Sequence, residues 1–236
     1  MKRARESRDA RNGSWLAAAL PLFVSGGALP AAAEAPVTWH AETLSSSPQG
    51  LHVTQYWSKG QDKMRAETVI GGHRLITMVN GERYYAVDVL SGRAISIERS
   101  KRARADDRKR PRLVGLEGFV IRERGGERVG EEMLAGSKCD VWRITDARGR
   151  REVWVRQDRA GEMLPLRVEI YNRAAGAEIR TDYVQWASGL DLPDRFFLPD
   201  PRFEVQELGY DDYVKRSGEG EMLVPVLHAN LLHGEK

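Results

Sequence analysis

Residues 51–98 constrain the fold of this chain more than any other stretch. They consist of runs of six to eight residues that are separated by glycine-containing turns. In the run 63–70, the apolar residues Met64 and Ala66 alternate with charged neighbours, which is the period of a strand with one dry face and one wet face. Asn80-Gly81 lies between two runs, and both residue types accept the positive φ of a tight hairpin turn. The stretch therefore predicts a continuous antiparallel meander.

Strand signals continue on both sides of this meander. A first strand is expected at 37–44, and turn residues at 45–50 follow it. After residue 126 the same signals recur at 127–134, 139–145, 151–157, 165–171 and 178–187. About eleven strands at a regular spacing are typical of an up-and-down barrel or a strongly curved antiparallel sheet.

Composition changes between residues 99 and 126. Residues 99–112 contain eight basic and two acidic residues and little apolar surface, so we expect an exposed basic loop there. Leu116 and Phe119 follow at helical spacing, which predicts a short amphipathic helix laid across one face of the sheet. The domain is expected to span 36–212, with residues 213–236 as a loosely attached C-terminal tail.

The N-terminus has the pattern of an export signal. Five basic residues precede the short apolar run 15–24, and Ala33-Glu34-Ala35 offers a cleavage site for signal peptidase. The alternative is an uncleaved anchor, but the run is shorter than the roughly 20 apolar residues of a spanning helix. We expect residues 1–35 to be a signal peptide that is removed.

Charge argues against nucleic acid as a partner. Once residues 1–35 are removed, 32 basic and 31 acidic residues remain, a net charge of +1. The basic run 99–112 is either a solvated loop or a surface attracted to anionic phospholipid or an acidic partner, where each Lys or Arg contributes about 1 kcal/mol. Aromatic residues do not interleave with it, so stacking on single-stranded nucleic acid is disfavoured.

No motif for catalysis is visible. The chain lacks a nucleophile elbow, a zinc-protease helix motif, a P-loop and a dinucleotide fingerprint. Its five histidines are scattered, and its single cysteine, Cys139, is interpreted as a small apolar residue within a strand, the alternatives being a reactive thiol or an intermolecular link. We therefore expect no enzymatic activity, no cofactor and no metal site.

The apolar residues of the meander allow two interpretations. They form an ordinary core beneath residues 113–121, or they line an incompletely filled concavity of the kind in which all-β proteins bind lipids. For the second interpretation the candidate lipid-binding residues are those of the dry face, with two from the covering helix: Trp57, Met64, Ala66, Met78, Tyr85, Val87, Ile95, Leu116 and Phe119.

From about residue 51 to residue 208 the sequence resembles the LolA-like superfamily of periplasmic lipoprotein-carrier and lipoprotein-sorting proteins. The resemblance rests on the order and spacing of loose motifs. These are YWSKGQDKMRAET, LITMVNGERYYAVDVLSGRAISI, VGEEMLAGSKCDVWRI, REVWVRQDRAGEMLPLRVEIY and LPDRFFLPDPRFEV.

The resemblance implies an antiparallel, half-open barrel with a helical lid over an apolar cavity. It also implies a periplasmic protein that binds lipoprotein acyl chains or another lipid, and a common dry face for the candidate residues. A related class, which resembles the sensor RseB, implies instead a regulator that binds lipid or lipoprotein together with a membrane signalling protein. A general outer-membrane biogenesis factor is a third interpretation.

Overall fold

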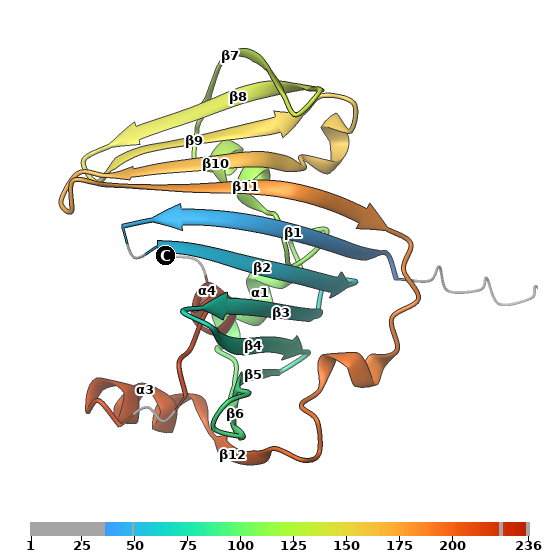
Figure 1. Ribbon diagram of the computed structural model, residues 1–236, viewed down its shortest axis with the longest axis vertical. Coiled ribbons are helices and arrows are strands. Elements are labelled where there is room, and N and C mark those ends of the chain that lie inside the picture. The colour runs from blue at the N-terminus through green and yellow to red at the C-terminus, as the bar shows by residue number, and fades with distance from the viewer. Residues whose placement is uncertain (1–35, 49, 222–223, 235–236) are drawn as a thin grey trace, which may run out of the picture. The chain divides into compact units, whose positions relative to one another are not determined.

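A single curved sheet organises the part of the chain that the computed structural model describes, residues 36–48, 50–221 and 224–234. Its twelve strands lie in the order β12-β6-β5-β4-β3-β2-β1-β11-β10-β9-β8-β7 (Figure 1). Neighbouring strands are antiparallel except for the parallel pair of β12 and β6. The predicted mainly β, half-open antiparallel architecture is confirmed. The predicted signal peptide, residues 1–35, lies outside the described residues.

The first strand in the chain joins the two halves of the sheet. β1 pairs with β2 on one side and with β11 on the other, so the early meander and the later strands form one surface. The strands are β1 (Thr38–Ser47), β2 (Gly50–Lys59), β3 (Lys63–Ile70), β4 (His73–Asn80), β5 (Arg83–Asp88), β6 (Arg93–Glu98), β7 (Glu127–Leu134), β8 (Ser137–Asp146), β9 (Gly149–Arg156), β10 (Pro165–Asn172), β11 (Ala177–Ser188) and β12 (Glu204–Leu208). β12, from the closing segment, is the strand that the sequence-based count did not include.

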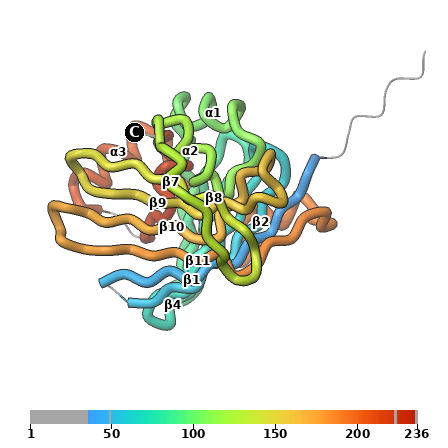
Figure 2. The backbone as a smooth tube through the Cα atoms, turned by 90° about the horizontal axis from the view of Figure 1, so that it is seen from above, coloured from blue at the N-terminus to red at the C-terminus, as the bar shows by residue number. Residues whose placement is uncertain are grey.

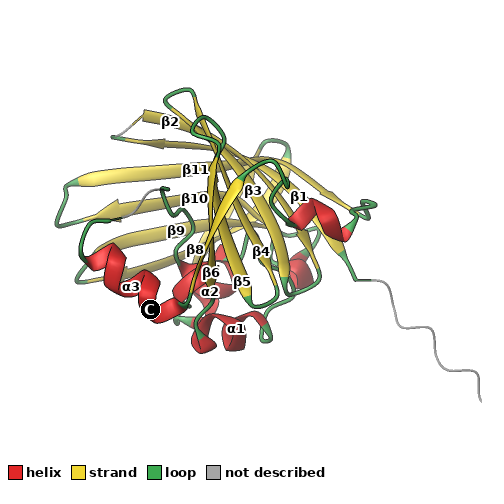
Figure 3. Cartoon of the chain, turned by 90° about the horizontal axis from the view of Figure 1, so that it is seen from below, coloured by secondary structure: helices red, strands yellow, loops and turns green. Residues whose placement is uncertain are grey.

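Short helices lie on one side of the sheet, toward which the strands curve (Figures 2 and 3). We call this side the concave face and the opposite side the convex face. The helices are α1 (Lys101–Asp107), α2 (Glu117–Glu123), α3 (Tyr210–Gly218) and α4 (Asn230–His233), and two 3₁₀ turns lie at Ala160–Glu162 and Asp194–Phe197. None of the helices within the described ranges has the length and apolar character needed to span a membrane.

The basic run 99–112 is not the exposed loop that its composition predicts. It contains α1, which begins after Ser100, whose Oγ accepts a hydrogen bond from the Ala103 amide (3.0 Å). The side chain of Arg99 is buried: its Nε donates to Leu231 O (2.6 Å), and its Nη1 donates to the Asp107 carboxylate (2.6 Å) and to a turn carbonyl. Charge alone misleads here, because a paired arginine can be buried.

The C-terminal segment, defined here as residues 224–234, packs onto the concave face. Val224, Leu231 and Leu232 are at most 5% exposed and belong to the same apolar cluster as the concave residues of β3–β6. Polar contacts hold it as well: the Tyr84 hydroxyl donates to Leu227 O, and Ser100 Oγ donates to His233 O (2.9 Å). The described part of the predicted tail is therefore a structural element of the domain.

Candidate functional site

The candidate residues of the meander do not share one face. Cross-strand partners in an antiparallel sheet lie on the same face, and Ala66 pairs with Thr77, Thr77 with Ala86, and Ala86 with Ile95. Ala66 and Ile95 therefore lie on the concave face, and Met64 joins them because it is two residues from Ala66. Opposite parity puts the other four candidates on the convex face: Trp57, Met78, Tyr85 and Val87.

A strap, residues 189–203, covers the convex face over β2–β6 and packs on apolar residues there. The Phe196 ring meets Trp57 edge-on, with ring centroids 5.4 Å apart, and the Arg65 guanidinium lies over the same ring. Met78 and Val87 are buried in a separate cluster against which Phe203 packs. These convex residues form a second core, so the structure separates them from any site on the concave face.

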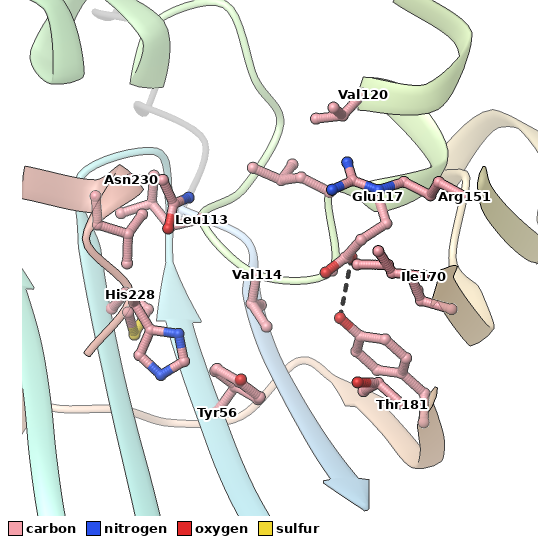
Figure 4. Close-up of a pocket in the computed structure, with 16 residues that line it drawn as sticks. Tyr56, Leu113, Val114, Glu117, Val120, Arg151, Ile170, Thr181, His228 and Asn230 are labelled. Carbon is pink, nitrogen blue, oxygen red and sulfur yellow. Dashed lines mark hydrogen bonds between the residues drawn. The ribbon is translucent and has the colours of Figure 1, made fainter. Parts of the chain in front are cut away.

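A central cavity of about 370 Å³ lies on the concave face, between the helices and the sheet. This volume falls in the range of roughly 300–1,000 Å³ that is usual for small-molecule sites. Of the predicted residues, Met64 and Leu116 line it, whereas Phe119 of α2 packs against the neighbouring apolar cluster. The lining comprises Tyr56, Met64, Arg151, Val168, Ile170, Thr181 and Tyr183 from the sheet, Leu113, Val114, Gly115, Leu116, Glu117 and Val120 from above, and His228, Asn230 and Leu231 from the C-terminal segment (Figure 4).

A buried arginine holds the cover of this cavity, the lid segment, which we define as residues 112–123. Arg112 donates to three backbone carbonyls: Nε to Val114 O (2.8 Å), Nη2 to Gly115 O (2.8 Å) and Nη1 to Glu162 O (2.9 Å). Burial lowers the pKa of its guanidinium to about 10, so it stays charged at neutral pH. Its charge also lies over the rings of Trp39, Phe119 and Trp186, with 5.3–5.5 Å to each centroid.

Two glycines allow the lid segment to lie close to the sheet. Gly115 has φ +60°, and a Cβ there would overlap the ring of Trp186. A Cβ at Gly118 would lie 2.6 Å from Met163 O. Glycine costs helix stability, and the close approach of α2 to the sheet explains why glycine stands at these two positions.

Polar groups form one side of the otherwise apolar cavity. Tyr183 Oη donates a hydrogen bond to Glu117 Oε2 (3.0 Å), dashed in Figure 4. Burial, reinforced by the Glu117 charge, raises the pKa of Tyr183 well above its usual value, so the phenol stays protonated and acts as a donor. Burial likewise raises the pKa of Tyr56. The arrangement can hold a ligand by its polar groups.

His228 closes the opposite side of the cavity. Burial lowers its pKa to about 4, so the imidazole is neutral at physiological pH. Its ring lies edge-on to Tyr56, with centroids 5.4 Å apart, and its Nε2 has no hydrogen-bond partner within the described part of the chain. Its backbone has φ +52°, which side chains with a Cβ adopt rarely. The sequence marks His228 only as one histidine of a weakly apolar stretch.

A row of hydroxyl groups crosses the concave face and was missed from the sequence. Thr54 Oγ1 lies 3.1 Å from Thr68 Oγ1, and Ser45 Oγ lies 2.9 Å from Thr181 Oγ1 on the far side of β1. Thr43 lies between them and contacts Thr54 O. Alternation places these residues on a common face of each strand, but threonine is so common in strands that composition gives no hint of a row. Within the described ranges, no group of three His, Cys, Asp or Glu side chains is arranged to hold a metal.

Comparison with known proteins gives matches at the level of fold only. No protein-family model matches the sequence, and no curated protein does. Among solved structures, an uncharacterised conserved protein from Thermus thermophilus matches with 11% identity and a TM-score of 0.52, over 72% of this chain and 90% of that chain.

Two further matches have lower scores. The Pseudomonas aeruginosa MucA/MucB complex matches with 14% identity and a TM-score of 0.46, over 73% of this chain and 59% of that chain. The LolA superfamily protein NE2245 from Nitrosomonas europaea matches with 14% identity and a TM-score of 0.32, over 71% of this chain and 92% of that chain. At TM-scores below 0.5 these two likenesses are too partial to bear on function, and the Thermus likeness concerns the fold alone.

Proposed function

We propose that this is an exported, periplasmic lipid-binding protein that holds acyl chains in the central cavity, and that it carries or sorts outer-membrane lipoproteins. The observation that supports it best is the cavity itself, which lies between an apolar sheet face and a separate lid. Met64, Val168 and Leu116 contribute apolar walls, and the buried Arg112 and the Tyr183–Glu117 hydrogen bond help to hold the lid. Each buried methylene of a chain contributes about 0.8 kcal/mol.

Binding rather than catalysis is the role we propose. The titratable groups at the cavity make contacts that suit a binding site. Tyr183 has a raised pKa and donates to Glu117, and His228 is neutral and lies edge-on to the Tyr56 ring with its Nε2 buried. Such groups orient a ligand.

The cavity can be tested by filling it. Ile170 lines it and is partly exposed, so Ile170→Trp should place an indole where a chain would lie. We expect binding of a fluorescent fatty acid to fall at least tenfold, because the indole displaces contacts worth more than about 1.4 kcal/mol. Val184→Trp is the matched control, since Val184 is 59% exposed on the convex face. Absence of binding by the unaltered protein, or equal binding by both variants, would refute the proposal.

A sensor that binds lipid and a membrane signalling protein is the second candidate. It is favoured by one feature: the cavity is lined both by Leu116 of the lid segment and by Leu231 of the C-terminal segment. A ligand larger than the cavity must shift one of these covers and so change the surface presented to an envelope protein. A carrier should take a lipoprotein from a membrane extract and pass it on, whereas a sensor should release a bound protein domain when lipid is added.

A further inference from the structure

A second hollow adjoins the central cavity at the far ends of β8–β10. Its volume is about 230 Å³, and we call it the basic pocket. Arg151 and Ile170 line both hollows, so the two meet at these side chains. The other residues of the basic pocket come from α2, its C-cap and the strand ends: Ile121, Arg124, Ile144, Asp146, Arg148, Gly149, Arg150, Tyr171 and Asn172.

Positive charge dominates this pocket. Its one carboxylate among the described residues belongs to Asp146, whose Oδ1 accepts the backbone amides of Arg148 (2.7 Å) and Gly149 (3.2 Å) and so belongs to the turn. Arg150 pairs with Glu152, with Nε 3.1 Å from Oε2. Among the described residues, Arg148 and Arg151 make no side-chain ion pair or hydrogen bond. The pocket therefore contains cations that lack an anion.

Arg151 is the most constrained of these cations. It pairs across the sheet with Ile144 and with Ile170, so its side chain stands in an apolar row of the concave face. A guanidinium in such a place loses hydration and cannot shed its proton, so a partner anion lowers its free energy. Figure 4 shows it on the same side of the cavity as Glu117, but the two make no ion pair, and Glu117 already accepts the Tyr183 hydrogen bond.

The volume of the central cavity limits the size of the apolar group that a ligand with such an anion can carry. A cavity of about 150 Å³ accommodates a six-carbon benzene, so the cavity of about 370 Å³ has room for roughly 15 carbons. That is one acyl chain, and a ligand with several chains would require the lid segment to move. The Glu117 carboxylate at the central cavity would repel an acidic head group and so favour the orientation with the head in the basic pocket.

We propose that the two hollows form one site for a single-chain amphiphile with an acidic head group, its chain in the central cavity and its head against Arg151 and Arg148. The inference rests on the proposed lipid-binding function and adds the class of ligand. A guanidinium binds carboxylate or phosphate oxygens through two parallel hydrogen bonds, which a hydroxyl head cannot accept in the same way.

The test compares three probes: hexadecanoate, 1-hexadecanol and inorganic phosphate. Calorimetric titration of the unaltered protein should give roughly ten- to a hundredfold tighter binding for hexadecanoate than for the alcohol, which is the contribution of hydrogen bonds to a charged group. Arg151→Met keeps an unbranched apolar stem but lacks the guanidinium, and it should remove that preference. Arg195→Met, at an exposed arginine of the strap, should leave it unchanged.

Each outcome has a distinct meaning. Equal affinity for the acid and the alcohol, or a preference that survives in Arg151→Met, would overturn the acidic head group and leave the acyl cavity standing. Failure of both amphiphiles to bind would instead refute the lipid-binding function. Inorganic phosphate binding as tightly as hexadecanoate would show an anion pocket unconnected to the cavity, which also overturns the inference. If Arg151→Met does not fold by circular dichroism, Arg148→Gln in the turn should show the same loss in smaller measure.

Discussion

Both halves of the concave face are apolar, but the central cavity lies beneath the cover of one of them. Over β3–β6 the apolar face is closed by the C-terminal segment, whose Leu231 and Leu232 reach the same cluster as Met64 and Val79. Over β1 and β9–β11 the face is closed by the lid segment, and the central cavity remains beneath it. We call these the filled half and the hollow half. An apolar sheet face does not by itself decide between a core and a site.

The two covers are fastened by different mixtures of apolar and polar contacts. The C-terminal segment contacts the filled half mainly through apolar side chains, with hydrogen bonds from Tyr84 and Ser100 to its carbonyls. The lid segment also buries apolar side chains, Val114 and Ile121, against the sheet, and Arg112 adds hydrogen bonds to carbonyls whose lengths and directions are fixed. At Gly115 and Gly118 the lid segment adds no side chain, and the space under it remains as the central cavity.

The largest effect should follow from loss of the buried ion pair in the filled half. Arg99→Met would leave the Asp107 carboxylate, with a side chain 10% exposed, without its partner. We expect the free energy of unfolding to fall by about 3–5 kcal/mol, as for other broken buried pairs. Urea titration measures it, and Arg108→Met, at an exposed position of the same basic run, should change it by less than about 0.5 kcal/mol. Equal losses in the two variants would contradict the structural role of the pair.

Substituting one leucine in each half allows the packing of the two halves to be compared. Leu232 is fully buried in the filled half, whereas Leu116 is 8% exposed and borders the cavity. Leu→Ala costs about 2–5 kcal/mol and costs least where neighbouring atoms are few. The loss of unfolding free energy, measured by thermal or chemical denaturation, should lie in the upper part of this range for Leu232→Ala. For Leu116→Ala it should lie at or below the lower end. The reverse order would mean that the hollow half is packed as tightly as the filled one.

His228, at the border between the halves, should make stability depend on pH. Its pKa is about 4 in the folded protein, below the ordinary 6.5, so between these values the unfolded chain binds a proton that the folded one does not. Stability is therefore complete above pH 6.5 and falls as the pH drops to 4, by on the order of 3 kcal/mol from this group. His228→Asn cannot titrate and suits the positive φ. Denaturation from pH 7 to 4 should show a shallower slope for this variant, and an unchanged slope would contradict the assignment.

Alternation predicted the strands well but could not assign their faces. Parity places Met64 and Ala66 on one side of β3 and Met78 on one side of β4, yet nothing in either run says which sides coincide. Which sides coincide depends on the register between the strands. Here both faces carry apolar residues, so the apolar pattern does not reveal the register. The strap is far from the meander in sequence, so its contact with Trp57 through Phe196 has no local signal.

The covers of the concave face were the least predictable part. Arg99 and Arg112 lie in a run that composition assigns to solvent, and their burial depends on carbonyls supplied by Leu231 and Glu162, more than a hundred and about fifty residues away. The C-terminal segment is apolar only in places, which predicts weak attachment. The adjacent leucines Leu231 and Leu232 are the signal in the C-terminal segment that indicates burial. The cavity exists because of these distant contacts, so the sequence could suggest a concavity without locating it.

The smallest effect on stability should come from the exposed side of α1, which lies against α4 over the filled half. Lys101 and Arg102 of α1 and Arg108, its C-cap, are exposed, while Ala103 and Asp107 are buried, so basic side chains face outward. Replacing all three by Gln should change the free energy of unfolding by less than about 1 kcal/mol, because solvated charges contribute little.

If this face contacts anionic membranes, binding to phosphatidylglycerol vesicles should weaken by about 1 kcal/mol for each charge removed. Vesicles of neutral phosphatidylcholine are the control, and raised salt should imitate the substitutions because it screens the attraction. Equal binding of the triple variant and the unaltered protein to anionic vesicles would assign these charges to solubility alone, and the filled half would then have no membrane-facing role.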